Sequence, residues 1–154
     1  MWPESTAFAA AMRQWLWLYP IVEIVHITGI ALLVGSVAMF DLRVLGCSRT
    51  LPVRLLARHL LPWTWTRFAI VAATGAMMFT AHATEFWSNP AFAVKLALIA
   101  AAGANALWFH PGSDGGAQRW GPGTAAPAPA KAAAALSLAL RLGAIGCGRP
   151  IACV

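Results

Sequence analysis

The stretch LYPIVEIVHITGIALLVGSVAMF, residues 18–40, decides the fold of this chain. It is long enough to cross the hydrocarbon core of a bilayer, which takes about 20 apolar residues at a rise of about 1.5 Å each. Two ionisable residues, Glu23 and His26, lie one helical turn apart inside it. Because ionisable groups at that depth are costly and are rarely retained without a use, the sequence indicates a functional site around this pair.

The composition indicates a membrane protein rather than a soluble domain. The chain has 154 residues, of which 60% are hydrophobic and only 10% are charged, and its mean hydropathy is positive. The net charge of +6 fits basic loops that lie against anionic lipid headgroups, so it does not predict binding to nucleic acid. The sequence contains none of the motifs that are typical of soluble enzymes, such as a phosphate-binding glycine loop, a nucleophile elbow or a zinc-finger spacing.

Four apolar stretches predict an all-α bundle of four transmembrane helices that forms a single domain over residues 1–154. The predicted spans are residues 18–40, 60–83, 91–109 and 129–152. A short helix over residues 5–16 is expected to lie in the membrane interface, anchored by Trp15, Trp17 and Tyr19. A Gly-, Pro- and Ala-rich loop over residues 112–129 is expected to be flexible. The fourth span is the least regular, because it contains Arg141 and Pro150.

Lys and Arg in the connecting segments predict the orientation in the membrane. The segment between spans one and two carries Arg43, Arg49, Arg54 and Arg58, and that between spans three and four carries Arg119 and Lys131. The segment between spans two and three, residues 84–90, has neither Lys nor Arg. Since short basic loops stay on the cytoplasmic side, both termini are predicted to lie outside a bacterial cytoplasmic membrane.

Polar residues from three predicted spans converge near the outer face. Glu23 with His26, and His82 with Glu85, are each i, i+3 pairs, a spacing that places both side chains on one helical face. Lys95 lies in the second turn of the third span. Glu23, His26, His82 and Lys95 are therefore candidates for binding haem b. In this hypothesis His26 is the principal ligand, His82 a second ligand or gate, and Lys95 a countercharge.

The same cluster allows other interpretations. Glu23, His26, His82 and Glu85 together are a ligand set for copper, iron or another transition metal, as in carboxylate-bridged bundles. Counting depth separates His82 from His26 by about two turns, roughly 10 Å, which is unfavourable for two ligands of one haem. A purely structural interpretation is an ion pair between Glu23 and Lys95, with His26 hydrogen-bonded to a neighbouring helix.

Further polar residues are expected near the cytoplasmic side. His59 and His110 lie at similar predicted depth and are candidates for a second haem, although two solvated interfacial rings are the simpler explanation. Asp41 and Arg67 are expected to form an ion pair that clasps the first two spans.

Helix packing is expected to depend on small residues and on the place of Arg141. Gly29 and Gly75, with other glycines of the spans, are expected to let helices approach closely, which implies no further function. Arg141 is expected to snorkel to the interface or to face Asn105, or else it marks a span that does not cross as drawn.

Four short motifs of this chain resemble the sequence pattern of a family of small bacterial four-helix membrane proteins of unknown function. The family pattern reads W-L-Y-P, E-x-x-H-x-x-G, D-L-R and N-P-x-F-x-x-K. It matches residues 17–20, 23–29, 41–43 and 89–95 of this chain. The resemblance covers almost the whole chain, and it implies the fold and the membrane location but no activity.

A more distant resemblance adds a chemical expectation. The membrane domain of copper-resistance protein D and the HemJ-type protoporphyrinogen oxidase also look like small helical bundles with a histidine early in one helix and a lysine opening another. By this resemblance His26 and Lys95 are the matching positions, and haem b or copper is the implied ligand.

The sequence thus predicts a multi-pass protein of the bacterial inner membrane that binds haem b or a transition metal for redox work or electron transfer. One alternative is a pathway for metal ions or protons through Glu23, His26, His82 and Glu85. Another is a cofactor-free accessory subunit of a membrane complex. The expected partners are membrane lipid and either a second copy of the chain or another membrane subunit.

Overall fold

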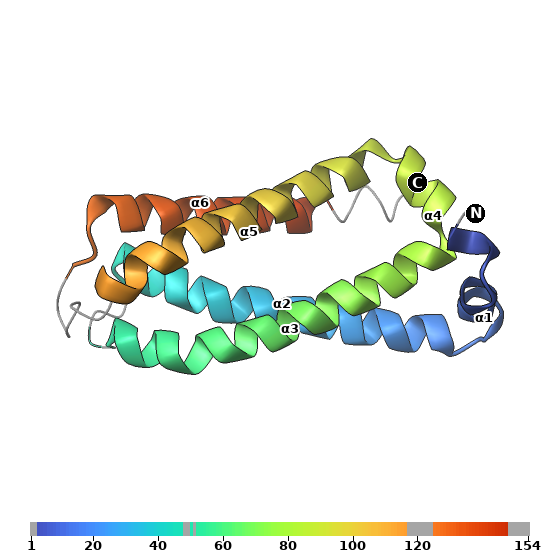
Figure 1. Cartoon of the computed structure of the whole chain (residues 1–154), viewed down its shortest axis with the longest axis horizontal. Helices are drawn as coiled ribbons and strands as arrows, with labels where there is room; N and C mark the ends of the chain where they lie inside the picture. Colours follow the sequence, from blue (N-terminus) through green and yellow to red (C-terminus); the bar gives the residue numbers. More distant parts are fainter. Residues whose placement is uncertain (1–2, 48–49, 51, 117–124, 148–154) are drawn as a thin grey trace.

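The structure is a computed structural model that describes residues 3–47, 50, 52–116 and 125–147. Over these residues the chain is helical and has no strand (Figure 1). The elements are η1 (Pro3–Ser5), α1 (Ala7–Gln14), α2 (Leu18–Leu45), α3 (Val53–Ala81), α4 (Ala83–Ser88), α5 (Pro90–Gly116) and α6 (Ala128–Gly146). The all-α prediction is therefore confirmed for the described part of the chain.

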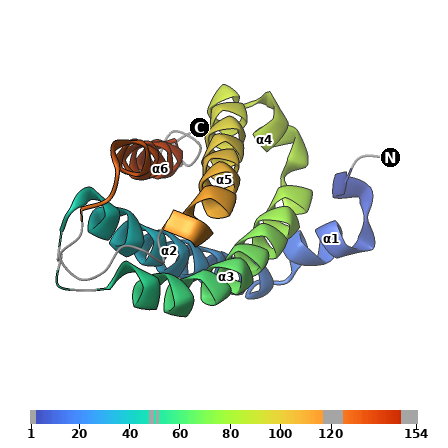
Figure 2. The same ribbon diagram turned by 60° about the vertical axis from the view of Figure 1, so that its left-hand side comes forward.

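The long helices pack as two hairpins. α2 packs along α3, and α5 packs along α6. α2 also contacts α6 and so joins the two hairpins, which makes it the central helix of the arrangement. The short helix α1 lies across one end of the α2–α3 hairpin, beside the start of α2 and the end of α3 (Figures 1 and 2).

Within the described parts of the chain, three helices are long and apolar enough to cross a membrane. They are α2, the part Pro90–Trp108 of α5, and α6. α3 is not among the candidate spans found in the described residues, because its residues 63–67 are tryptophan, threonine and arginine rather than aliphatic. The helices are thus compatible with a membrane protein, while the predicted span at residues 60–83 stays a prediction.

Few side chains are buried, and many large apolar side chains face outward. Ile24 and Ile27 of α2 are 64% and 58% exposed, and Leu142 of α6 is 66% exposed. Two small buried clusters hold the helices together, one of Val44, Ala126, Ala130 and Ala134, the other of Met12, Val22 and Ala81. Lipid tails would solvate the outward-facing apolar surface, which is larger than a water-soluble monomer normally exposes.

Several helix boundaries differ from the sequence prediction. α3 begins at Val53 instead of near residue 60, so Pro62 lies inside it. α5 continues to Gly116, so the first part of the predicted flexible loop is helical. α6 ends at Gly146, and Pro150 lies outside the described residues. Hydropathy missed these ends because it marks the apolar part of a helix, whereas polar residues can extend the helix further.

The predicted short N-terminal helix is present, although α1 covers only part of residues 5–16. The Thr6 Oγ1 atom accepts a hydrogen bond from the Ala9 N–H at 3.1 Å, which is an ordinary N-terminal cap. Trp15 and Trp17 follow the helix and are 68% and 72% exposed. This exposure suits the predicted role of both tryptophans as interfacial anchors.

Gly29 allows α2 and α3 to approach closely. A Cβ atom added at Gly29 would lie 2.8 Å from Cγ2 of Val71 in α3, which is closer than two carbon atoms can pack. The expected packing role of this glycine is therefore confirmed. Gly103 of α5 differs, since a Cβ atom there would meet nothing within 4 Å among the described residues.

Candidate functional site at His26

His26 of α2 is hydrogen-bonded to α3. Its Nδ1 atom lies 2.9 Å from Oγ1 of Thr74, and the Thr74 hydroxyl donates to the backbone carbonyl of Ile70 at 2.7 Å. A hydroxyl has a single hydrogen, so the Thr74 oxygen accepts from the Nδ1–H of His26. The Nε2 atom of a neutral His26 then carries a lone pair. The expected hydrogen bond from His26 to a neighbouring helix is confirmed.

Gly75 leaves room for the His26 ring. A Cβ atom at Gly75 would lie 3.1 Å from Cε1 of the ring, a distance at which the ring would have to shift. Thr74 is buried and His26 is half-buried. The hydrogen bond on one side and the glycine backbone on the other therefore fix the position of the imidazole.

Lys95 and Glu23 do not form the expected ion pair. The charge of Lys95 in α5 is near enough to act on the His26 ring, whereas Glu23 is exposed and acts on Tyr19. The ion pairs of the described residues join other groups. Lys95 thus lies on the His26 side of the molecule, while Glu23 is exposed and belongs to neither of the ion pairs of the described residues.

His82 lies at the end of α3, beside the start of α2. Its Nδ1 atom is 3.3 Å from Oε2 of Glu85, and its ring contacts Tyr19 edge-on at a centroid distance of 5.5 Å. Tyr19 precedes His26 by two helical turns, so His82 and His26 lie in layers roughly 10 Å apart. The structure therefore joins the second predicted i, i+3 pair but keeps it apart from His26.

No group of three or more His, Cys, Asp or Glu side chains in the described parts of the chain could hold a metal ion. The proposed ligand set of Glu23, His26, His82 and Glu85 is thus not assembled in this structure. The four side chains stay apart because the two i, i+3 pairs lie at different heights along α2 and α3. The haem hypothesis, which needs only one protein ligand, does not depend on this assembly.

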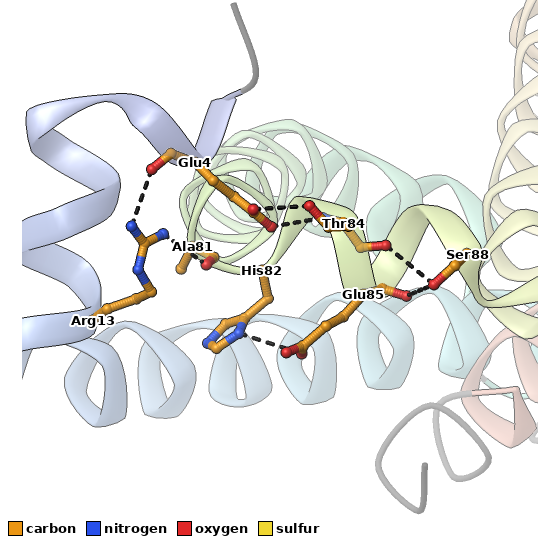
Figure 3. Close-up of polar contacts among 7 residues, drawn as sticks. All are labelled: Glu4, Arg13, Ala81, His82, Thr84, Glu85 and Ser88. Carbon is orange, nitrogen blue, oxygen red and sulfur yellow. Dashed lines mark hydrogen bonds and ion pairs between the residues drawn. The ribbon is translucent and has the colours of Figure 1, made fainter.

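A polar network that the sequence did not predict lies at the α1 end of the molecule (Figure 3). Glu4 accepts hydrogen bonds from the backbone N–H of Thr84 at 2.6 Å and from its hydroxyl at 2.8 Å. Arg13 donates to the carbonyls of Ala81 and Glu4, both at 3.0 Å. The bonds from Thr84 hold the pKa of Glu4 below its ordinary value of 4.5. Because Glu4 lies far from Thr84 in the sequence, no local pattern could have revealed the network.

The predicted ion pair between Asp41 and Arg67 is wrong. Asp41 is buried against α6, where its Oδ2 atom accepts from Ser137 at 2.6 Å and from Arg141 at 3.0 Å. Arg67 donates instead to the hydroxyl of Ser36. Asp41 lies on the side of α2 that faces α6, whereas Ser36 lies on the side that faces α3. The prediction therefore chose an arginine from α3 where the true partner belongs to α6.

Arg141 of α6 is therefore paired with Asp41, and the expectations that it snorkels or faces Asn105 are wrong. Its pairing with Asp41 links α6 to α2. Asn105 of α5 donates to the backbone carbonyl of Ala133 at 3.0 Å, which links the second hairpin internally. Arg141 is thus compatible with a regular α6.

The second predicted haem is not tested by the structure. His59 is exposed on α3 and lines a shallow pocket with Leu55 and Arg58. The side chain of His110 lies outside the described residues, although its backbone belongs to α5. The pairing of these two histidines stays a prediction.

Comparisons of the chain with protein-family models, with curated proteins and with solved structures find no match.

Proposed function

We propose that this chain is a multi-pass membrane protein that binds haem b through His26 and serves in redox chemistry or electron transfer. One observation carries the proposal, the hydrogen bond between Nδ1 of His26 and Oγ1 of Thr74 at 2.9 Å. A ligating histidine almost always donates its second ring N–H to a neighbouring acceptor, which fixes the ring and leaves the other nitrogen for the metal. His26 has this arrangement between two largely apolar helices.

His26 is the one residue of the chain that would bind the haem iron. His82 is engaged with Glu85 and Tyr19, so it is a gate residue near the surface and not a second ligand of the same iron. Lys95, whose charge acts on the His26 ring, would balance the negative charge of the haem propionates. Haem, when bound, supplies a one-electron couple whose potential depends on the axial ligand.

We also propose that the protein lies in a bacterial cytoplasmic membrane with both termini outside. Three apolar helices support the membrane location. The basic residues at and around the connection of α2 to α3, namely Arg43, Arg49, Arg54 and Arg58, support the orientation, since positive segments remain on the cytoplasmic side. Membrane lipid is then the constant partner, and a second copy or another membrane subunit would supply or accept the electron.

An absorption spectrum with elemental analysis of the detergent-purified protein tests the proposal. We expect a Soret band with close to one iron per chain, and we expect His26→Ala to remove the band. His59→Ala is the matched control, because His59 is an exposed histidine of α3, and it should leave the band unchanged.

The other outcomes are equally informative. Copper, iron or zinc without a Soret band would favour the metal or ion pathway. A colourless, metal-free protein that is purified with another subunit would favour an accessory role. A Soret band that persists unchanged in His26→Ala would refute the ligand assignment.

A further inference from the structure

The junction between α3 and α4 exposes backbone groups that these helices cannot satisfy by themselves. α3 ends at Ala81 and α4 begins at Ala83, and His82 between them has φ −136° and ψ 40°, outside the helical region. The carbonyl of Ala81 and the N–H of Thr84 therefore lie at helix ends, where intrahelical partners are missing.

The N-terminal segment supplies a partner for each of these groups (Figure 3). The guanidinium of Arg13 donates to the Ala81 carbonyl, and the Glu4 carboxylate accepts from the Thr84 N–H. A positive group thus caps the C-terminus of one helix and a negative group caps the N-terminus of the next, which is the favourable sense for both helix dipoles. Arg13 also donates to the Glu4 carbonyl, so the two caps are joined.

The same segment covers apolar side chains. Met12 is 1% exposed and packs in a cluster with Val22 of α2 and Ala81 of α3. Val22 lies one helical turn from His26 in the sequence. The segment therefore closes the end of the contact between α2 and α3 that leads toward His26.

We propose that residues 3–14 form a lid over this end of α2 and α3, closed at neutral pH and released by acid. The hydrogen bonds that Glu4 makes to Thr84 join the lid to α4, and they are exposed to solvent. Loss of the Glu4 charge weakens its bonds to Thr84 and removes its attraction to Arg13, which leaves the segment held less firmly, through the bond from Arg13 to the Ala81 carbonyl and the packing of Met12. The lid does not depend on the bound cofactor proposed above.

The direction of the pH effect follows from Glu4. The hydrogen bonds from Thr84 lower the pKa of Glu4 in the folded protein below 4.5, so the carboxylate stabilises the closed lid above the pKa of the free side chain. That stabilisation is lost as the pH falls through the lowered pKa. Arg13 and His82 face Glu4, and the positive charge of Arg13 also lowers the pKa of Glu4. Glu85 faces His82 at 3.3 Å and not the lid.

Hydrogen exchange measured by mass spectrometry on the full chain in lipid nanodiscs tests the lid. Protection factors, corrected for the intrinsic pH dependence of exchange, are compared at about pH 7 and about pH 2, the lower value lying well below the ordinary pKa of a glutamate side chain. We expect the amides of α1 to lose protection several-fold at the lower pH, while the amides of α6 keep theirs. In Glu4→Gln we expect α1 to show the same reduced protection at both pH values, because glutamine lacks the carboxylate charge and does not titrate.

Glu85→Gln is the matched control, since it removes a carboxylate from the same end of the molecule without a contact to the lid. We expect its acid transition to equal that of the wild type. An α1 segment with unchanged protection at low pH would overturn the proposal, as would an unaltered transition in Glu4→Gln. A parallel loss in α6 would show global acid unfolding instead of lid release, and would overturn it as well.

Discussion

α2 contacts its two long neighbours in different ways. Toward α3 it presents Gly29 and the imidazole of His26, which is hydrogen-bonded to a hydroxyl. Toward α6 it presents the carboxylate of Asp41, which is paired with the guanidinium of Arg141. Gly29 and the ring of His26 are accommodated against α3 at small cost, whereas the contact with α6 buries two opposite charges that tolerate burial only together. The ion pair between Asp41 and Arg141, called the charge lock below, therefore joins α2 to α6. The close packing of α2 against α3 instead positions the ring of His26.

The largest effect is expected from breaking the charge lock. Asp41→Ala leaves the Arg141 guanidinium in the membrane region with its main partner removed, which should lower the free energy of unfolding by about 3–5 kcal/mol. The measurement is thermal or denaturant unfolding in detergent micelles.

A paired replacement separates the value of the pair from the cost of breaking it. In the double variant Asp41→Leu, Arg141→Met, both charges are absent and apolar side chains fill their places. The stability should return to within about 1 kcal/mol of the wild type or exceed it. A double variant as unstable as Asp41→Ala would show that the lock is worth more than its replacement by apolar packing.

Close packing against α3 is tested by adding one methyl group. Gly29→Ala places a Cβ atom against Val71 and should cost about 1–3 kcal/mol through overpacking. Gly103→Ala is the matched control on an open face of α5, and it should be neutral or stabilise the helix by up to about 1 kcal/mol. Equal effects of the two substitutions would mean that α2 and α3 are not in close contact.

The smallest effect on stability is expected at the ring itself. Thr74→Val removes the acceptor for His26 and should lower the unfolding free energy by about 1 kcal/mol, while Thr74→Ser keeps the hydroxyl and should cost less. Thr74→Val and Thr74→Ser should differ more in their absorption spectra than in their free energies of unfolding, because a His26 ring that is not held by a hydrogen bond is a poorer haem ligand. Identical Soret bands in Thr74→Val and Thr74→Ser would argue against a role for the hydroxyl.

The sequence predicted where a residue lies along its helix better than it predicted which neighbouring helix that residue faces. The apolar runs correctly predicted α2, α5 and α6, and the i, i+3 spacing correctly joined His82 to Glu85. Asp41 was assigned the wrong arginine because Arg67 and Arg141 are both available to it at a similar depth, and only the packing of α2 between α3 and α6 decides the partner. The true partner lies 100 residues away in the sequence, beyond any local pattern.

The same limit explains what was missed at His26. A threonine next to a glycine, Thr74 and Gly75, carries no local signal of a ring that approaches from another helix. The expectation that His26 would bond to a neighbouring helix followed from the cost of burying a polar group in an apolar environment. Which residue would accept that bond required the structure.

Rescue with free imidazole tests the assignment of His26 most directly. His26→Gly removes the side chain and leaves a space that an added imidazole can enter, so the absorption spectrum of this variant is recorded with and without imidazole. We predict that His26→Gly lacks the Soret band of the wild type and that millimolar imidazole restores it. A variant with the wild-type band in the absence of imidazole would contradict the assignment of His26 as the haem ligand.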